Sequence, residues 1–293
     1  MPLDMMQTAY ADVAARHGFI PANHQCAQFE QVEARKLFDE DGRELPGWLR
    51  IHNVTRGKDL HVASDQYRVI TNEEAFTGFE DAIRQSGLRT GDMVVGTDYS
   101  HDGARIFRQY LFPDHMVQVK PGVDVALRII MFNSYDGTMA FRGTAGAFNF
   151  VCANTSIVGH EVAGFKMKHN GKADAAAGIR SLVSSAAAFA AEADEWKRWP
   201  SIRVEDAQAV GLFKAAPGAS EAVAEHLALR WLEARDSGGL QSGPNLWALY
   251  NVLTAWATHT EGKGENKAAS RYTREGVVQK AMGTVEWKAL MAG

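Results

Sequence analysis

Alternating arginine and aromatic side chains make one predicted strand the most chemically suggestive segment of this sequence. The run from 104 to 112 carries Arg105, Phe107, Arg108 and Tyr110. Successive side chains of a strand point to opposite faces, so Arg105 and Phe107 share one face while Arg108 and Tyr110 share the other. Proteins that hold single-stranded nucleic acid use cations for the phosphates and aromatic rings for the bases. Other predicted strands add two more arginines to this set, Arg128 and Arg142.

The same residues also have a purely structural interpretation. Aromatic side chains fill the core of an amphipathic sheet, and arginines line its exposed face. Taken alone, the residue types favour this structural interpretation, and a binding surface is the alternative.

A second basic stretch lies near the C-terminus. Its cations are Lys263, Lys267, Arg271, Arg274 and Lys280. Lysine and arginine side chains supply the sequence-independent contacts of proteins to phosphate backbones. A solvated helix face has the same composition and is the favoured interpretation, with phosphate contacts as the alternative.

Metal chemistry has weak support. Structural zinc sites show closely spaced cysteine or histidine ligands, whereas the ten histidines are scattered and no Cys-x-x-Cys occurs. His160-Glu161 begins like a zinc-protease motif, but the second histidine of that motif is missing. An alternative is that folding brings His160, Glu161, His169 and Asp136 together around a divalent metal.

Standard nucleotide-binding and nucleophile motifs are missing too. Gly262-Lys263-Gly264 lacks the Walker spacing and a preceding strand, and no Gly-x-Ser-x-Gly elbow occurs. Cys152 ends an apolar run, which favours core packing over catalysis. We therefore expect no catalytic residue, no metal-binding residue and no cofactor.

Composition places the chain among ordinary globular proteins. It has 293 residues, of which 46% are hydrophobic and 23% charged, with a net charge of −4 and a pI near 6.2. This balance argues against wholesale coating of nucleic acid but allows a local basic groove. Two distant cysteines, no secretion-signal pattern and no long apolar run favour a cytoplasmic protein with no membrane partner.

The order of the local patterns predicts an α+β fold. A helix capped by Thr71 or Asn72 comes first. Asp-Gly turns at 102–103 and 136–137 then separate the strands of an antiparallel meander. Together they make a helix-plus-sheet part over about residues 54–155.

Helical periodicity predicts the rest of the chain. Residues 170–282 read as helices, and with the sheet they form a single α+β domain over residues 51–282. Residues 1–50 show no clean period and are predicted to be a partly irregular N-terminal arm. Residues 283–293 are predicted to be a C-terminal tail that contains a short helix over residues 284–291.

Several of these segments resemble a known family. The turn Asn133-Ser134-Tyr135-Asp136-Gly137-Thr138 precedes a strand that ends in Val151-Cys152-Ala153-Asn154-Thr155. This pair is similar to the hallmark of the phage and plasmid-like proteins catalogued as domain of unknown function 932. The segments from Tyr67 to Phe76 and from Trp247 to His259 resemble two further parts of that family. The resemblance implies a protein of mobile elements in a bacterial host cell, with no established activity to carry over.

The hallmark residues are expected to shape the fold rather than to react. Asparagine, aspartate and threonine side chains bond nearby backbone groups in turns, glycine supplies a positive φ, and the cysteine would pack beneath. The residues concerned are Asn133, Asp136, Gly137, Cys152, Asn154 and Thr155.

The leading functional hypothesis is a non-enzymatic phage or mobile-element protein that binds nucleic acid, single-stranded DNA in particular, and promotes strand annealing or recombination. A helix, a meander and a long helix are similar in outline to phage single-strand annealing proteins, which is an analogy of fold alone. The alternatives are a metal-dependent enzyme acting on nucleic acid or nucleotide, and a protein that antagonises host defence through protein contacts. Homo-oligomerisation is compatible with each.

Overall fold

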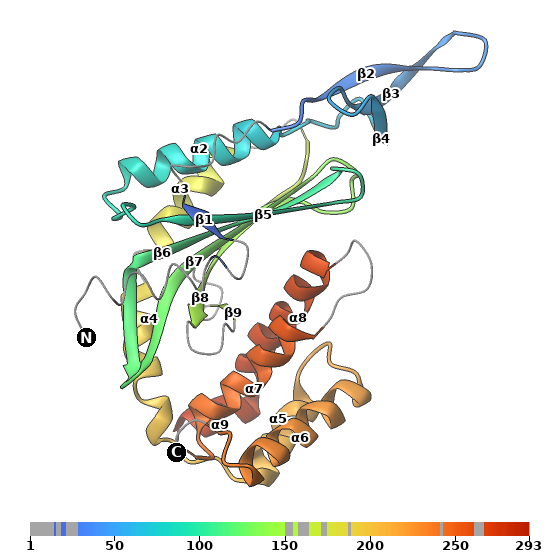
Figure 1. The fold of residues 1–293 in the computed structure, drawn as a ribbon. Coiled ribbons are helices and arrows are strands. Elements are labelled where there is room, and N and C mark those ends of the chain that lie inside the picture. Colours follow the sequence, from blue (N-terminus) through green and yellow to red (C-terminus); the bar gives the residue numbers. More distant parts are fainter. Residues whose placement is uncertain are drawn as a thin grey trace.

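The structure, a computed structural model, describes residues 15, 19–21, 29–149, 155–157, 164–170, 175–186, 189–240, 243–260 and 267–292. Antiparallel strands form most of the N-terminal half and helices form the C-terminal half, which confirms the predicted α+β class (Figure 1).

The larger sheet positions most of the residues singled out above. Its strands are β1 (Ile20–Pro21), β5 (Val94–Ser100), β6 (Arg105–Lys120), β7 (Val123–Ser134), β8 (Phe141–Asn149), β9 (Thr155–Ile157) and β10 (Gly164–Met167). They follow the order β1-β5-β6-β7-β8-β10, with β9 also paired to β8, and every pairing is antiparallel. The predicted turn before β6 is confirmed, because His101, Asp102 and Gly103 all have positive φ.

Pro113 lies within a strand of this sheet. Strand β6 runs through Pro113 to Lys120, with a register shift between Phe112 and Met116. A proline is tolerated in a strand at such an irregularity, because no ladder hydrogen bond from its nitrogen is needed there.

Helix α2 (Asn72–Gln85) covers one face of the sheet, together with α3 (Ala175–Ala186) (Figure 1). The hydroxyl of Thr71 accepts a hydrogen bond from the backbone of Glu74, so Thr71 is the N-cap. The side chains of Phe76 and Phe79 are fully buried, and the Phe79 ring lies 4.6 Å from that of Tyr110 on β6. This layer is the core of the N-terminal half.

The remaining helices pack around tryptophans. They are α4 (Phe189–Trp196), the short η2 (Trp199–Ser201), α5 (Asp206–Ala215), α6 (Glu221–Asp236), α7 (Leu246–His259), α8 (Lys267–Met282) and α9 (Val285–Ala292). The Trp199 ring lies 5.0 Å from that of Tyr250 and 5.3 Å from that of Trp287. Because α9 buries Trp287, residues 285–292 belong to this core and are not the tail that was predicted.

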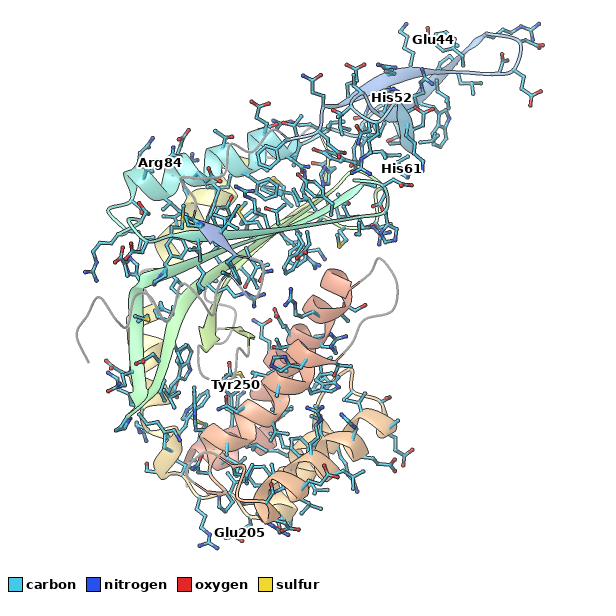
Figure 2. All side chains as sticks on the ribbon, viewed as in Figure 1. Glu44, His52, His61, Arg84, Glu205 and Tyr250 are labelled. Atoms are coloured by element: carbon cyan, nitrogen blue, oxygen red, sulfur yellow. The ribbon has the colours of Figure 1, made fainter. Side chains whose placement is uncertain are left out.

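The N-terminal arm is also more regular than predicted. Strands β2 (Val32–Phe38), β3 (Glu44–Asn53) and β4 (Lys58–Ser64) form a separate three-stranded antiparallel sheet. A domain boundary at residue 50 would cut through β3. We call residues 32–64 the β-arm; it projects past the end of α2, with Glu44 near its outer end and His61 where it joins the body (Figures 1 and 2).

Candidate nucleic-acid interface

The sheet face under α2 takes two of the proposed contact residues out of reach of a ligand. Arg108 is 2% exposed and donates hydrogen bonds to Glu80 (2.8 Å), to the hydroxyl of Tyr110 (2.9 Å) and to Thr97 (2.9 Å). Tyr110 is fully buried, and burial raises the pKa of its hydroxyl well above the ordinary value. The proposal that Arg108 and Tyr110 contact nucleic acid is therefore corrected, because both residues hold α2 on the sheet.

The prediction that Arg128 contacts nucleic acid is also wrong; this residue lies on the opposite face of the sheet. Its guanidinium is fully buried and donates to Gln109 Oε1 at 2.9 and 2.6 Å and to Glu275 Oε1 at 3.1 Å. Burial lowers the pKa of Arg128 to about 10. Because Glu275 belongs to α8, this buried ion pair ties the helical half to the sheet and leaves no surface for a ligand.

Beside that ion pair, two arginines and two phenylalanines make a continuous stack. Strand register places Phe107, Phe132 and Arg142 directly across from one another on β6, β7 and β8. The phenylalanine rings lie 4.6 Å apart, edge to face. The guanidinium of Arg142 lies 4.6 Å from the centre of the Phe132 ring, and that of Arg271 on α8 lies 5.7 Å from the centre of the Phe107 ring.

We call these four residues the Arg–Phe ladder. It brings together the two basic stretches that the sequence presented separately, the sheet and the C-terminal segment. Both rings are buried, so they offer no platform for stacking bases, whereas both arginines are half-buried and keep part of their surface open. Contact with an aromatic face holds a guanidinium in place while the cation keeps its charge.

Arg105 lies on the same face but is tied to the β7–β8 turn. Its Nε donates to Asp136 Oδ2 at 2.5 Å, and the backbone of Thr138 donates to Asp136 Oδ1 at 3.1 Å. Burial opposes the ionisation of Asp136, but the hydrogen bonds from Thr138 and Arg105 outweigh it and lower the pKa of the carboxyl. Asp136 therefore acts as the charged anchor of this turn.

The family-like motifs meet at the same turn. The amide nitrogen of Asn133 donates to the backbone oxygen of Ile70 (2.7 Å) and to Asn72 Oδ1 (2.9 Å), and the backbone nitrogen of Asn72 donates to the Tyr135 hydroxyl (2.7 Å). The side chains of Asn72, Asn133 and Tyr135 are all buried. The two motif segments thus hold the start of α2 against the end of β7.

Gly137 completes this arrangement. Its φ is +69°, and a Cβ atom there would lie 2.7 Å from the imidazole Nε2 of His61 on the β-arm. Only glycine fits both the backbone and the space. Of the other motif residues, Thr155 lies in strand β9, whereas Cys152 and Asn154 fall outside the described residues.

Arg274 has a structural partner as well. It donates to the backbone oxygens of Ala257 (2.9 Å) and Thr260 (2.7 Å), at the C-terminal end of α7. A cation at that end satisfies carbonyls that the helix leaves unpaired and complements its dipole. Lys267 belongs to α8, but its side chain is not described, and Lys263 falls outside the described residues.

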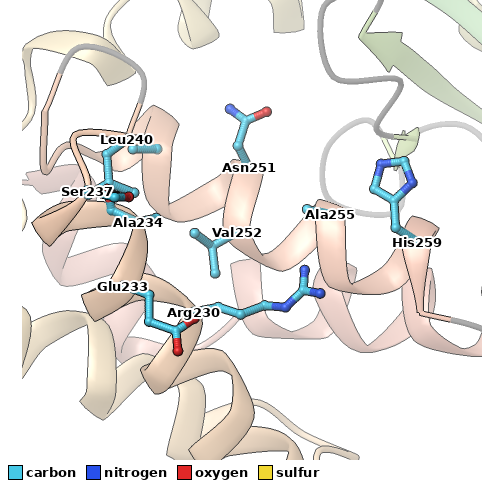
Figure 3. A pocket seen from close by; sticks show the side chains of 11 residues that line it. Arg230, Glu233, Ala234, Ser237, Leu240, Asn251, Val252, Ala255 and His259 are labelled. Carbon is cyan, nitrogen blue, oxygen red and sulfur yellow. Dashed lines mark hydrogen bonds between the residues drawn. The ribbon is translucent and has the colours of Figure 1, made fainter.

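An open groove between α6 and α7 begins beside the end of α7 (Figure 3). Its volume is about 630 Å³. Small and apolar side chains line much of it, including Ala234, Leu240, Ala248, Val252 and Ala255. The guanidinium of Arg230 extends along the groove toward His259 (Figure 3). Sequence reasoning missed Arg230, because an arginine on a predicted amphipathic helix carries no signal of its own.

The metal-site alternative gains no support from the described residues. His160 and Glu161 fall outside them, and no group of three histidine, cysteine, aspartate or glutamate side chains within them could hold a metal ion. Asp136 is bound to Arg105 and Thr138, while the His169 ring stacks on Tyr67 with ring centres 5.2 Å apart.

Within the described residues, no helix is both long and apolar enough to cross a membrane.

Comparison with known proteins identifies the chain at the level of a family. No curated protein and no solved structure matches the chain. The family model described as "Domain of unknown function (DUF932)" matches residues 59–282, about three quarters of the sequence. The chain therefore belongs to the DUF932 family.

Proposed function

We propose that this protein binds the phosphate backbone of nucleic acid, single-stranded DNA above all, along the face of the sheet that meets α8. The Arg–Phe ladder carries the proposal, because it fixes two half-buried guanidiniums on a shared aromatic support. We further propose that the protein works for a mobile element in the bacterial cytoplasm, where binding would serve strand annealing or recombination.

The ladder supports phosphate contacts rather than the base stacking that the sequence suggested. Phe107 and Phe132 are 3% and 1% exposed, so neither ring can take a base on its face. Arginine binds phosphate oxygens through a planar set of donors, and its weak hydration lowers the cost of a partly buried contact. Contacts of this kind fix the position of a strand without reading its sequence.

A line of cationic and imidazole groups leads away from the ladder. Arg271 and Arg274 are one turn apart on α8, and Arg274 donates to the backbone oxygens of Ala257 and Thr260, near His259 at the end of α7. His259 and Arg230 then line the groove between α6 and α7. With Glu233 as an acidic neighbour in the groove lining, Arg230 and His259 offer a polyanion contacts beyond the ladder, whereas the protein as a whole is acidic.

A binding assay with paired variants tests the proposal. Fluorescence anisotropy of labelled single-stranded and duplex oligonucleotides should show tighter binding of the single strand. The double variant Arg142→Gln with Arg271→Gln should weaken that affinity at least tenfold, because it removes two guanidiniums while keeping much of their packing.

A matched control separates the ladder from the net charge. The control variant Arg43→Gln with Arg203→Gln also removes two positive charges. Its two side chains are 79% and 78% exposed and are far from the ladder in sequence. This control should bind like the unaltered protein. Equal weakening in both double variants, or no binding by the unaltered protein at low salt, would remove the ladder from the account.

A further inference from the structure

The β-arm carries a concentration of exposed apolar side chains that no other described part of the chain covers. Nine large hydrophobic residues are exposed in the described part of the chain, and five lie in this arm. They are Phe38, Leu45, Trp48, Val54 and Val62, with Trp48 at 53% and Val62 at 46%. Large exposed apolar groups gathered in one place mark interaction surfaces, and tryptophan is the residue most enriched at their centres.

Strand register gathers the central part of this surface on one face. Trp48 pairs with Ser64 and Arg50 pairs with Val62, so Trp48 and Val62 are diagonal neighbours on the same side of the sheet. The opposite face buries Ile51 and Ala63 against Tyr135 of the body. We call the side of Trp48 and Val62 the outer face; the arm that bears it projects from the body beyond α2 (Figure 1).

The outer half of the arm has little support of its own. Beyond Trp48 only β2 and β3 continue, joined by the turn that precedes Glu44, and Phe38 there is 52% exposed. An isolated two-stranded ribbon is at best marginally stable in water, so a partner that covers the outer face would stabilise it.

The charges of the arm decide which kind of partner fits. Residues 32–64 contain six arginines and lysines and six aspartates and glutamates, so the arm has no net charge. On the outer face Arg35 pairs with Glu33 at 2.5 Å and Arg50 with Asp59 at 3.2 Å. A nucleic acid would need a net positive surface, and it would be repelled by the acidic turn Asp39-Glu40-Asp41.

We infer that the outer face of the β-arm docks on the same face of a second copy of this chain. A two-fold interface must be complementary to itself, and this face combines an apolar centre with both signs of charge around it. Two neutral arms approach each other without net repulsion, and each arginine of one copy finds carboxylates in the other.

The size of the face limits the strength of the association. Three strands about 4.8 Å apart and seven residues of about 3.3 Å each present a flat area of roughly 300 Å². Even doubled to allow for the relief of the side chains, this is less than the roughly 800 Å² per partner of a standard stable interface. The pairing is therefore a weak, concentration-dependent dimer.

Sedimentation equilibrium of the full chain over a wide concentration range tests the inference. The unaltered protein should show a reversible monomer–dimer equilibrium, and Trp48→Lys should weaken it at least tenfold, because Trp48 is the apolar centre. Val62→Lys is a second variant on the same face and should act in the same direction. Both side chains are exposed, so folding should be retained, as circular dichroism will verify.

The control places the same change on another surface. Leu229 is 59% exposed on α6, and Leu229→Lys should leave the equilibrium unchanged. A protein that stays monomeric at the highest concentration, or a dimer that Trp48→Lys and Val62→Lys leave intact, overturns the inference. Oligonucleotide binding by the monomeric variants distinguishes this outcome from a failure of the proposed nucleic-acid contact.

Discussion

At the scale of single residues, the family-like motif is a set of buried hydrogen bonds rather than a reaction centre. Asn133 is fully buried and donates both to the backbone before α2 and to Asn72. A buried acceptor that loses its donor costs more free energy than a hydrogen bond contributes on average, because the acceptor cannot return to water. The motif therefore belongs to the stability of the fold.

Replacing Asn133 by alanine should lower the free energy of unfolding by about 2–3 kcal/mol, since two acceptors lose their donor. Urea unfolding followed by circular dichroism measures the change. Gln85→Ala, at an exposed position of α2, should stay within about 0.5 kcal/mol of the unaltered protein. Equal stability of both variants would mean that the motif has no structural role.

Two buried tyrosines and one half-buried tyrosine predict how stability responds to alkaline pH. Burial raises the pKa values of the Tyr67, Tyr110 and Tyr135 hydroxyls above the ordinary value of 10. Unfolded tyrosine ionises near pH 10. Below that pH the three tyrosines contribute fully to the free energy of unfolding, and their contribution is lost as the pH rises further. The lowered pKa of Arg128, about 10, acts in the opposite direction but is a single group.

The free energy of unfolding should therefore fall between about pH 10 and pH 11, by at most about 1.4 kcal/mol per pH unit for each tyrosine. Urea titrations at several pH values measure it, and phenolate absorbance should appear only on unfolding for these three residues. Constant stability across this range would contradict the burial of the tyrosines.

At the scale of elements, the ion pair between Arg128 and Glu275 joins β7 to α8. Glu275→Leu should cost about 3–5 kcal/mol, because it leaves the Arg128 guanidinium buried without its carboxylate. Adding Arg128→Met should restore part of the loss, since an apolar pair needs no compensating charge. Urea unfolding of the two variants tests this. A double variant less stable than the single one would show that the ion pair itself supplies the stability.

How far the sequence predicted these elements depends on how local their signals are. The Thr71 cap and the Asp-Gly turns were found because each lies within a few residues of the structure that it specifies. The strands of the β-arm were not predicted, because charged residues alternate on the exposed positions and no apolar period of two marks these strands. Likewise α9 was predicted as a helix in a tail outside the core, because its burial depends on distant tryptophans.

The candidate site was predicted in part for the same reason. The residue types of the ladder and their strand parity could be read from the sequence, and Arg142 and Arg271 were both named. The burial of Arg108 and Arg128 could not be read from the sequence, because their partners are distant. Glu80 lies 28 residues from Arg108, and Glu275 lies 147 residues from Arg128. An arginine facing solvent and one facing a distant carboxylate look alike in a sequence.

At the scale of the whole molecule, two separate surfaces divide the proposed tasks. The Arg–Phe ladder lies where the helical half meets the sheet, and the β-arm projects past the end of α2 (Figure 1). One surface is cationic and suits a polyanion, while the other is neutral and suits a second copy. Paired copies would each keep the ladder available, so self-association and strand binding are compatible.

The salt dependence of single-strand binding tests the central claim most directly. Each phosphate contact contributes about −0.7 to the slope of log affinity against log salt for a single strand. The slope of the Arg142→Gln, Arg271→Gln variant should therefore be shallower by about 1.4 than that of the unaltered protein. The Arg43→Gln, Arg203→Gln control should keep the full slope. An unchanged slope in the ladder variant would show that these two arginines do not touch the phosphate backbone.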